Sequence, residues 1–235
     1  MTSIRTSYRA GLVRAAVWAS AAALVGCASP TSRFYTLSGA NAGSDGVVPA
    51  AAAQRPTTAP ALLFEVPPVD TPAQVSRNQL VVQAGDARVD VLEQERWASA
   101  PADEIRRALS GDLAARLGSF DVYGAPYPAG VPVYRITVNV RRFESWPGSR
   151  AVLDAVWSVR AVRTQAVLTC RTVASEPVEA GYPALVDGHR RAVAQMADDI
   201  AAAVRVLAAR PGAAGAGATA SGCASGSQSA VSSSN

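Results

Sequence analysis

Three long stretches in the second half of the chain alternate between hydrophobic and polar residues. A repeat of two puts successive side chains on opposite faces of a strand, so each stretch predicts a strand with one buried and one exposed face. The turns between them, at 147–148 and 164–165, are too short for the crossover that a parallel pair needs. We therefore expect antiparallel neighbours, which cover residues 133–143, 151–162 and 166–173.

Shorter runs rich in β-branched and aromatic residues lie earlier in the chain. Residues 79–83 and 88–93 flank a short segment that contains Gly85 and Asp86, which predicts a hairpin. The runs 34–37 and 62–66 are each predicted to form one short strand.

Two segments carry apolar residues at helical spacing instead. The first helix is predicted to begin near Ser99, which can cap it, and to end at Gly118. The second is predicted to begin near Asp187 and Gly188 and to end near residue 208. The apolar stripes are Ile105, Leu109, Leu113 and Leu117 in the first, and Val193, Met196, Ile200, Val204 and Leu207 in the second. Together with the strands, these helices predict an α+β fold, an antiparallel β-sheet with two helices packed on one face.

Composition separates this fold from two simpler segments. Residues 39–60 and 210–235 consist mainly of Ala, Gly, Pro, Ser and Thr, so we predict a linker and a disordered tail. Between them, 61–209 has the length of one ordinary domain, and 27–38 holds the lipidated N-terminus and the first short strand.

The N-terminus has the features of a secretory signal. Three arginines and no acidic residue precede Cys27, and an apolar run over 15–25 is too short to span a bilayer. The run ends in Leu24-Val25-Gly26-Cys27, which resembles the lipobox of bacterial lipoproteins. We therefore predict a signal peptide over 1–26, cleavage after Gly26 and a diacylglycerol on Cys27; the alternative is an ordinary secretory signal with a chance cysteine.

Acyl chains on Cys27 would anchor the protein, since two or more chains hold a protein stably on a membrane. Ala28 replaces the Asp that tends to retain lipoproteins at the inner membrane of enteric bacteria, which favours the periplasmic face of the outer membrane. Removal of three of the 22 basic residues with the signal leaves 19 against 18 acidic residues, a net charge of +1. This balance, without a basic cluster, argues against nucleic-acid binding.

Few residues suggest chemistry. His189 is the only histidine, so a Ser-His-Asp arrangement would have to use it with Asp187 or Asp198, and no GxSxG motif is present. A solvated His189 at a helix start is the simpler interpretation, and we predict no catalytic residue, no metal site and no cofactor. An oxidising periplasm would permit a disulfide between Cys170 and Cys223, although Cys223 lies in the tail.

Arg96 and Trp97 directly precede the predicted first helix. One interpretation is that Trp97 packs as a lid on the helix and the sheet. The other is that both residues anchor a partner, because Trp and Arg are enriched in binding hot spots.

Several segments in a fixed order carry a family resemblance. They are the lipobox, then Phe34-Tyr35-Thr36-Leu37, the run 77–82, and Leu92-Glu93-Gln94-Glu95-Arg96-Trp97-Ala98 leading into 102–109. This order resembles the PqiC family of ABC-type transport auxiliary lipoproteins, with similarity over most of 33–208. The linker and the tail depart from the usual pattern.

The resemblance implies a part in a transport machine. Its members accompany MCE-domain proteins, which move phospholipid or other hydrophobic molecules across the periplasm, and they receive the MCE assembly at the outer membrane, with a homo-oligomeric ring as one arrangement. The resemblance also implies that Phe34–Leu37 pairs in a sheet. The other classes considered are a stand-alone envelope-integrity lipoprotein and a periplasmic hydrolase.

Overall fold

The computed structural model describes residues 31–39 and 60–209. The chain divides into two compact units, Met1–Ser32 and Arg33–Asn235, and all that follows concerns the second. The predicted cleavage after Gly26 and lipidation of Cys27 lie outside the described residues, as do nearly all of the predicted linker and the tail. These assignments therefore stay predictions.

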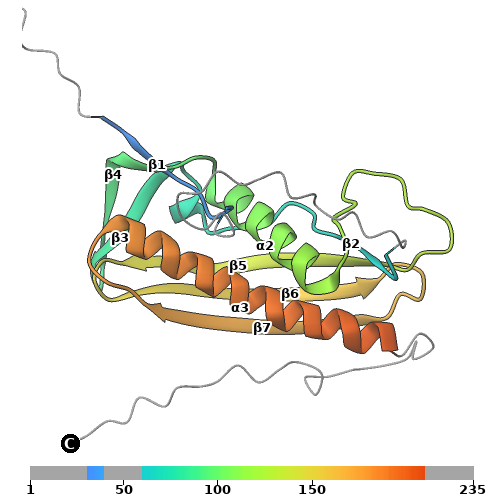
Figure 1. Cartoon of the computed structure of the whole chain (residues 1–235). Coiled ribbons are helices and arrows are strands. Elements are labelled where there is room, and N and C mark those ends of the chain that lie inside the picture. The colour runs from blue at the N-terminus through green and yellow to red at the C-terminus, as the bar shows by residue number, and fades with distance from the viewer. Residues whose placement is uncertain (1–30, 40–59, 210–235) are drawn as a thin grey trace, which may run out of the picture. The chain divides into compact units, whose positions relative to one another are not determined.

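Two helices and seven strands make up the described part of the chain (Figure 1). In chain order they are β1 (Arg33–Tyr35), β2 (Leu63–Glu65), the short 3-10 helix η2 (Ala73–Val75), β3 (Gln79–Gly85), β4 (Arg88–Trp97), α2 (Pro101–Leu117), β5 (Val133–Trp146), β6 (Arg150–Ala161), β7 (Val167–Pro177) and α3 (Tyr182–Ala209). This content confirms the predicted α+β class. The strands form two sheets, one with the order β1-β4-β3 and one with the order β2-β5-β6-β7.

Strand direction follows the length of each connection. The strands joined by short turns, β3-β4 and β5-β6-β7, pair antiparallel as expected. β1 pairs with β4 and β2 pairs with β5 in parallel. Since β1 and β2 join their partners through long stretches of chain, short-turn geometry does not constrain their direction. The sheets are therefore mostly, but not wholly, antiparallel.

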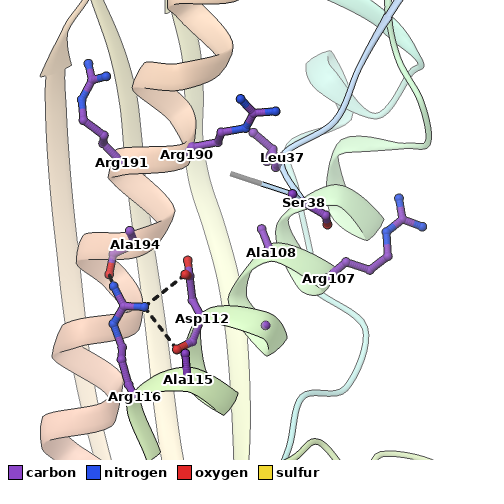
Figure 2. A pocket seen from close by; sticks show the side chains of 12 residues that line it. Leu37, Ser38, Arg107, Ala108, Asp112, Ala115, Arg116, Arg190, Arg191 and Ala194 are labelled. Carbon is purple, nitrogen blue, oxygen red and sulfur yellow. Dashed lines mark hydrogen bonds and ion pairs between the residues drawn. The ribbon is translucent and has the colours of Figure 1, made fainter. Parts of the chain in front are cut away.

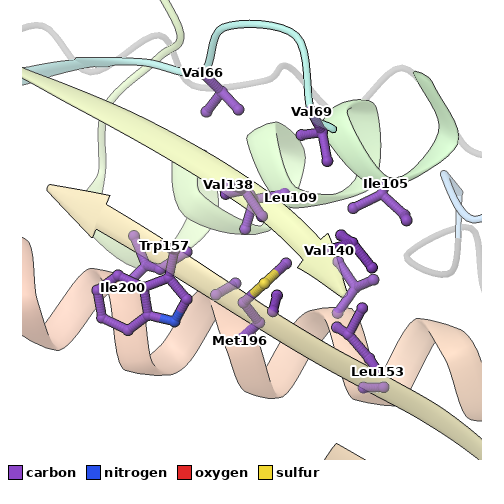
Figure 3. Packing of buried hydrophobic residues seen from close by; sticks show 14 of the residues in the cluster. Val66, Val69, Ile105, Leu109, Val138, Val140, Leu153, Trp157, Met196 and Ile200 are labelled. Atoms are coloured by element: carbon purple, nitrogen blue, oxygen red, sulfur yellow. The ribbon is translucent and has the colours of Figure 1, made fainter. Parts of the chain in front are cut away.

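The helices pack on the strands through the predicted apolar stripes. α3 lies across β6 and β7, and α2 lies beside α3 (Figure 1). Ile105 and Leu109 of α2 and Met196 and Ile200 of α3 are fully buried, and they belong to the same hydrophobic cluster as Trp157 of β6 (Figure 3). Trp157 and Leu153 thus lie on the buried face, which confirms the alternation in β6.

Both helix starts differ from the prediction. Ala100, not Ser99, is the N-cap residue of α2, and no side chain caps that end. α3 begins at Tyr182, several residues before the predicted start at Asp187 and Gly188. Gly188 lies inside the helix because α3 approaches the sheet closely there: a Cβ on Gly188 would lie 2.9 Å from Cβ of Ala151. The glycine is needed for packing, and it does not mark a helix boundary.

Two positions in the long strands also differ from simple alternation. A register shift between Val140 and Arg142 in the β5-β6 pair turns Phe143 onto the buried side. Asp154, expected on the exposed face, lies there but is buried, because Arg171 donates hydrogen bonds of 2.8 and 2.6 Å to its two oxygens. These bonds from Arg171 outweigh desolvation and lower the pKa of Asp154.

Candidate functional site

A buried carboxylate joins the segment after β1 to the start of α2. Oε2 of Glu104 accepts hydrogen bonds from the Thr36 hydroxyl at 2.7 Å and the Leu37 amide at 2.8 Å. Oε1 accepts bonds from the Ser99 hydroxyl at 2.7 Å and amide at 3.1 Å, and from Arg107 at 2.6 Å. We call these five residues the Glu104 network. Glu104 lies in the first turn of α2, and its side chain fixes a segment that is more than 60 positions away in the sequence.

The Glu104 network favours the ionised carboxylate. Burial alone would raise the pKa of Glu104, but the hydrogen bonds from Ser99, Thr36 and Leu37, together with the charge of Arg107, outweigh it and lower the pKa. The N-terminal segment is thus held by β-pairing and by a charged anchor point. Only six residue steps separate Cys27 from Arg33, so the chain between them spans at most about 20 Å.

A groove of about 470 Å³ lies between α2, α3 and the segment 37–39. Figure 2 shows its lining, in which small residues lie between the arginines of the two helices. The lining residues are Leu37, Ser38, Gly39, Arg107, Ala108, Gly111, Asp112, Ala115, Arg116, Arg190, Arg191 and Ala194.

The arginines of this groove are already compensated. Arg116 pairs with Asp112 and Asp198, Arg190 pairs with Asp187, and Arg191 pairs with Glu176. Arg107 belongs to the Glu104 network. Nε of Arg190 is a buried donor without a partner among the described residues. Because acidic side chains occupy the guanidinium groups, the groove has little free positive charge with which to bind an anion.

His189 is not solvated as expected; its side chain is fully buried. Its ring stacks on Phe143 with the ring centroids 3.9 Å apart, and a 2.8 Å hydrogen bond joins its Nε2 to the hydroxyl oxygen of Ser145. Burial lowers the pKa of His189 to about 3, so the ring is neutral at ordinary pH. A solvent-borne substrate does not reach this ring, because α3 extends past it and the sheet covers it.

Arg96 and Trp97 occupy different environments at the end of β4. Trp97 is 2% exposed and packs near Phe143, with ring centroids 5.9 Å apart, which fits the packing alternative. Arg96 is partly exposed, and its Nε donates to the Glu93 carbonyl at 2.8 Å. A partner could touch Arg96 directly, whereas Trp97 could contribute only by positioning β4 and β1. The partner-binding role of this pair stays a prediction.

Three exposed aromatic residues gather in the loop 118–132, which we call the distal loop. Phe120, Tyr123 and Tyr127 are 55%, 45% and 41% exposed. The distal loop follows the C-terminal end of α2, whereas Glu104 and β1 lie at its N-terminal end (Figure 1). The 17 residues of α2 span about 25 Å. The sequence showed the aromatic residues among Gly and Pro, but their exposure depends on the fold.

The distal loop is held in one arrangement. Oδ1 of Asp121 accepts bonds from the amides of Val66 and Tyr123, and Oδ2 accepts a bond from the hydroxyl of Ser110 at 2.9 Å. The hydroxyl of Tyr127 donates to buried Glu65 at 2.6 Å. The exposed rings are therefore carried on a fixed backbone, which lowers the entropy cost of binding a partner.

Metal-binding and membrane-spanning features are absent from the ranges 31–39 and 60–209. In these ranges no three His, Cys, Asp or Glu side chains come together as a metal site, and no helix is long and apolar enough to cross a membrane. Cys170 in β7 is buried and disulfide-bonded. Cys223 lies outside the described residues.

Comparison with known protein families identifies the family of this chain. Residues 47–201, well over half of the chain, match the model of the ABC-type transport auxiliary lipoprotein component family. The chain belongs to this family. The resemblance to PqiC proteins is thereby confirmed, and the family is described as a lipoprotein component of transport and not as an enzyme.

Three solved structures are similar to this auxiliary lipoprotein at low identity, and the first of them shares its fold. One uncharacterised protein has a TM-score of 0.55 at 18% identity, over 73% of this chain and 97% of its own. A Xanthomonas campestris protein of the family DUF330 has a TM-score of 0.48 at 14% identity, over 64% of this chain and 87% of its own. A PelC dodecamer from Paraburkholderia phytofirmans has a TM-score of 0.33 at 12% identity, over 57% of this chain and 83% of its own. No curated protein matches.

Proposed function

We propose that this auxiliary lipoprotein is carried on the outer membrane by lipids on Cys27 and receives the MCE-domain protein of its transporter there. In this role it catalyses no reaction. It docks the periplasmic assembly that moves phospholipid or other hydrophobic molecules, and so it helps to maintain the envelope.

One observation carries the proposal: the chain is fixed to the domain immediately after the predicted anchor. β1 pairs with β4 from Arg33 onward, and the Glu104 network holds Thr36 and Leu37 directly behind it. With about 20 Å of chain between Cys27 and Arg33, the domain stays close to the membrane that bears the lipid. A partner anchored in the other membrane has to reach across the periplasm to it.

The distal loop supports the docking part of the proposal. It lies at the far end of α2 from β1, so the end of the domain that bears it is directed away from the tether. Exposed aromatic side chains are enriched in the energetic centres of protein interfaces. A homo-oligomeric ring would present several copies of the distal loop to one MCE assembly.

The buried state of His189 also favours a docking role over the hydrolase alternative. Its neutral ring contacts Phe143 and Ser145 within the core, so it cannot act as a base toward a bound substrate in this arrangement.

Photocrosslinking in cells tests the proposal. A photoreactive amino acid replaces Phe120 or Tyr123 in the distal loop, and in a matched variant it replaces Val173, which is 52% exposed on β7. We expect crosslinks to the MCE protein from the two loop positions and not from Val173, identified by mass spectrometry after purification from membranes. Crosslinks from Val173 alone would move the docking face to the sheet. If no MCE protein is captured or co-purified, the stand-alone envelope lipoprotein becomes the better interpretation.

A further inference from the structure

Phe34 is the most exposed large hydrophobic residue in the described part of the chain, with 65% of its surface exposed. Its neighbours in the same segment have structural roles. The hydroxyl of Tyr35 donates to Glu95 at 2.5 Å, and Leu37 is buried in the core. Phe34 makes no comparable contribution to the interior. Its ring is therefore free to make a contact outside the domain.

Phe34 lies on an edge strand of the small sheet, on the face opposite to Tyr35. β1 is an edge strand in the order β1-β4-β3, and Phe34 pairs in register with Arg96 of β4. On the face of Phe34, the charge of Arg96 is compensated by Glu93. Arg33 and Glu95 also pair with each other, but they alternate with Phe34 and Arg96 and lie on the opposite face with Tyr35. The surface around Phe34 is thus an exposed aromatic ring beside a neutralised ion pair, which fits an apolar contact better than an electrostatic one.

The covalent chain places this ring close to the lipid anchor. Phe34 is seven residue steps from Cys27, so the two Cα atoms lie at most about 25 Å apart. Phe120, which is nearly as exposed, lies at the opposite end of α2. Of these two exposed phenylalanines, only Phe34 is tied by a short segment to a residue whose acyl chains enter the bilayer.

We propose that Phe34 inserts into the headgroup region of the membrane beside the anchor and that this second contact orients the domain. The proposal rests on lipidation of Cys27 but not on the MCE partner. Acyl chains at the end of a short segment limit distance and leave rotation free, whereas an aromatic ring at the interface adds a second fixed point. With Phe34 on the lipid, the distal loop faces the periplasm.

Fluorescence quenching by brominated lipid tests the insertion. The full-length lipidated protein is reconstituted in phosphatidylcholine vesicles, with or without bromine in the upper acyl chains, as the variant Phe34→Trp or the matched variant Phe120→Trp. Mass spectrometry first verifies the acyl chains on Cys27. The wild type supplies the background emission of Trp97, Trp146 and Trp157. We expect the emission added by Phe34→Trp to fall by about half or more, as for a ring at the boundary of headgroups and acyl chains, and that of Phe120→Trp to stay unchanged.

Four results would overturn the proposal. Equal emission of Phe34→Trp in both kinds of vesicle would show that the ring stays in water although the protein is anchored. Quenching of Phe120→Trp instead would mean that the opposite end faces the membrane. Quenching of Phe34→Trp that appears only with added phosphatidylglycerol, an anionic lipid, would show that arginine side chains bind the membrane and that the ring does not insert by itself. Absence of lipid on Cys27 would remove the anchor itself, whereas failure of the crosslinks to the MCE protein would leave this orientation intact.

Discussion

Buried side chains of this protein differ in whether all of their polar atoms have hydrogen-bond partners. Trp157 is buried and still satisfied, because its indole N–H donates to the Thr172 hydroxyl at 2.9 Å, and that hydroxyl donates to Asp199 at 2.6 Å. His189 is buried with one nitrogen satisfied by Ser145, while its Nδ1 has no partner in the described ranges. Truncation of Trp157 should therefore lower the stability of the fold. A change of pH should alter the stability through the protonation of His189.

Replacement of Trp157 by Ala should destabilise the fold strongly. The change removes a large ring from between α3 and the sheet and leaves the Thr172 hydroxyl without its indole donor, so we expect a loss of about 3–5 kcal/mol in the free energy of unfolding. Urea unfolding followed by circular dichroism measures it. The matched change Val173→Ala, at an exposed position of β7, should stay within about 0.5 kcal/mol. Equal midpoints for the two variants would contradict the packing.

His189 should make stability fall as pH is lowered. Its pKa is 6.5 in the unfolded chain and about 3 in the folded one, so the unfolded state binds a proton first and stability declines as pH falls from 6.5 toward 3. Between pH values of about 7.5 and 5.5 the free energy of unfolding should fall by about 1.4 kcal/mol from this group. In this range Glu104 stays ionised, because its pKa is lowered. His189→Gln should remove most of the slope, and an unchanged slope would assign it to another group.

At the scale of elements, β1 is too short to be stable by itself. Its three residues pair with one edge of β4, and the segment behind it is held further by the Glu104 network at the start of α2 and by the burial of Leu37. β1 and α2 are therefore coupled through one carboxylate, although they are separated by more than 60 positions in the sequence.

Glu104→Gln should loosen this coupling while it preserves the size of the side chain. The amide group can accept hydrogen bonds at one position only, so it leaves donors of Thr36, Leu37 or Ser99 unsatisfied, at a cost of about 2–3 kcal/mol. Hydrogen exchange at the Leu37 amide should become faster, and the midpoint of urea unfolding should fall. The matched change Asp103→Asn, in the same turn but exposed, should alter neither. Retained protection of Leu37 in Glu104→Gln would show that β-pairing and the burial of Leu37 hold the segment without the carboxylate.

For the whole molecule, the anchor and the domain act as one unit only if the connection between them is short. The pairing of β1 places the predicted linker behind the first strand and not between the lipid and the domain. If β1 were unpaired, the tether would extend from Cys27 to Ala61, and the domain could move freely. The position of the linker therefore decides how deletions should act.

Deletion of residues 42–57 should leave function nearly intact. The deleted segment lies between β1 and β2 and does not set the distance from the membrane, so crosslinking from Phe120 to the MCE protein should remain close to the wild-type level. A flexible insertion between Ala28 and Arg33 should impair it, since that change lengthens the tether. The reverse result, an impaired deletion and a harmless insertion, would show that the 39–60 segment works as a tether.

Lipidation itself is tested at the anchor. Cys27→Ser should abolish acylation and leave the precursor uncleaved by the lipoprotein signal peptidase, because the thiol is the acceptor of the diacylglycerol. Metabolic labelling with a fatty-acid analogue measures the outcome. Cys223→Ser is the matched control and should keep the label, whereas equal label in both variants would exclude Cys27 as the site.

Local sequence alone determined much of this protein. Alternation identified β5 to β7, since a strand exposes one face whatever packs on the other, and helical spacing identified the buried stripes of both helices. The α+β class and the family followed from these elements and from the order of short motifs. The tertiary structure decided the features that depend on distant contacts.

Three such features determine how the candidate sites work. The early start of α3 at Tyr182 buries His189, because residues before the expected boundary continue the helix along the sheet. Pairing of β1 with β4 forms a separate sheet, and Glu104 becomes a buried anchor point only when Thr36 and Leu37 lie against α2. The distal loop lies between α2 and the start of β5, and its exposure likewise depends on how these elements pack. A periodic pattern reports which face of an element is apolar, but the partner of that face is set by packing between segments far apart in the chain, which no local pattern encodes.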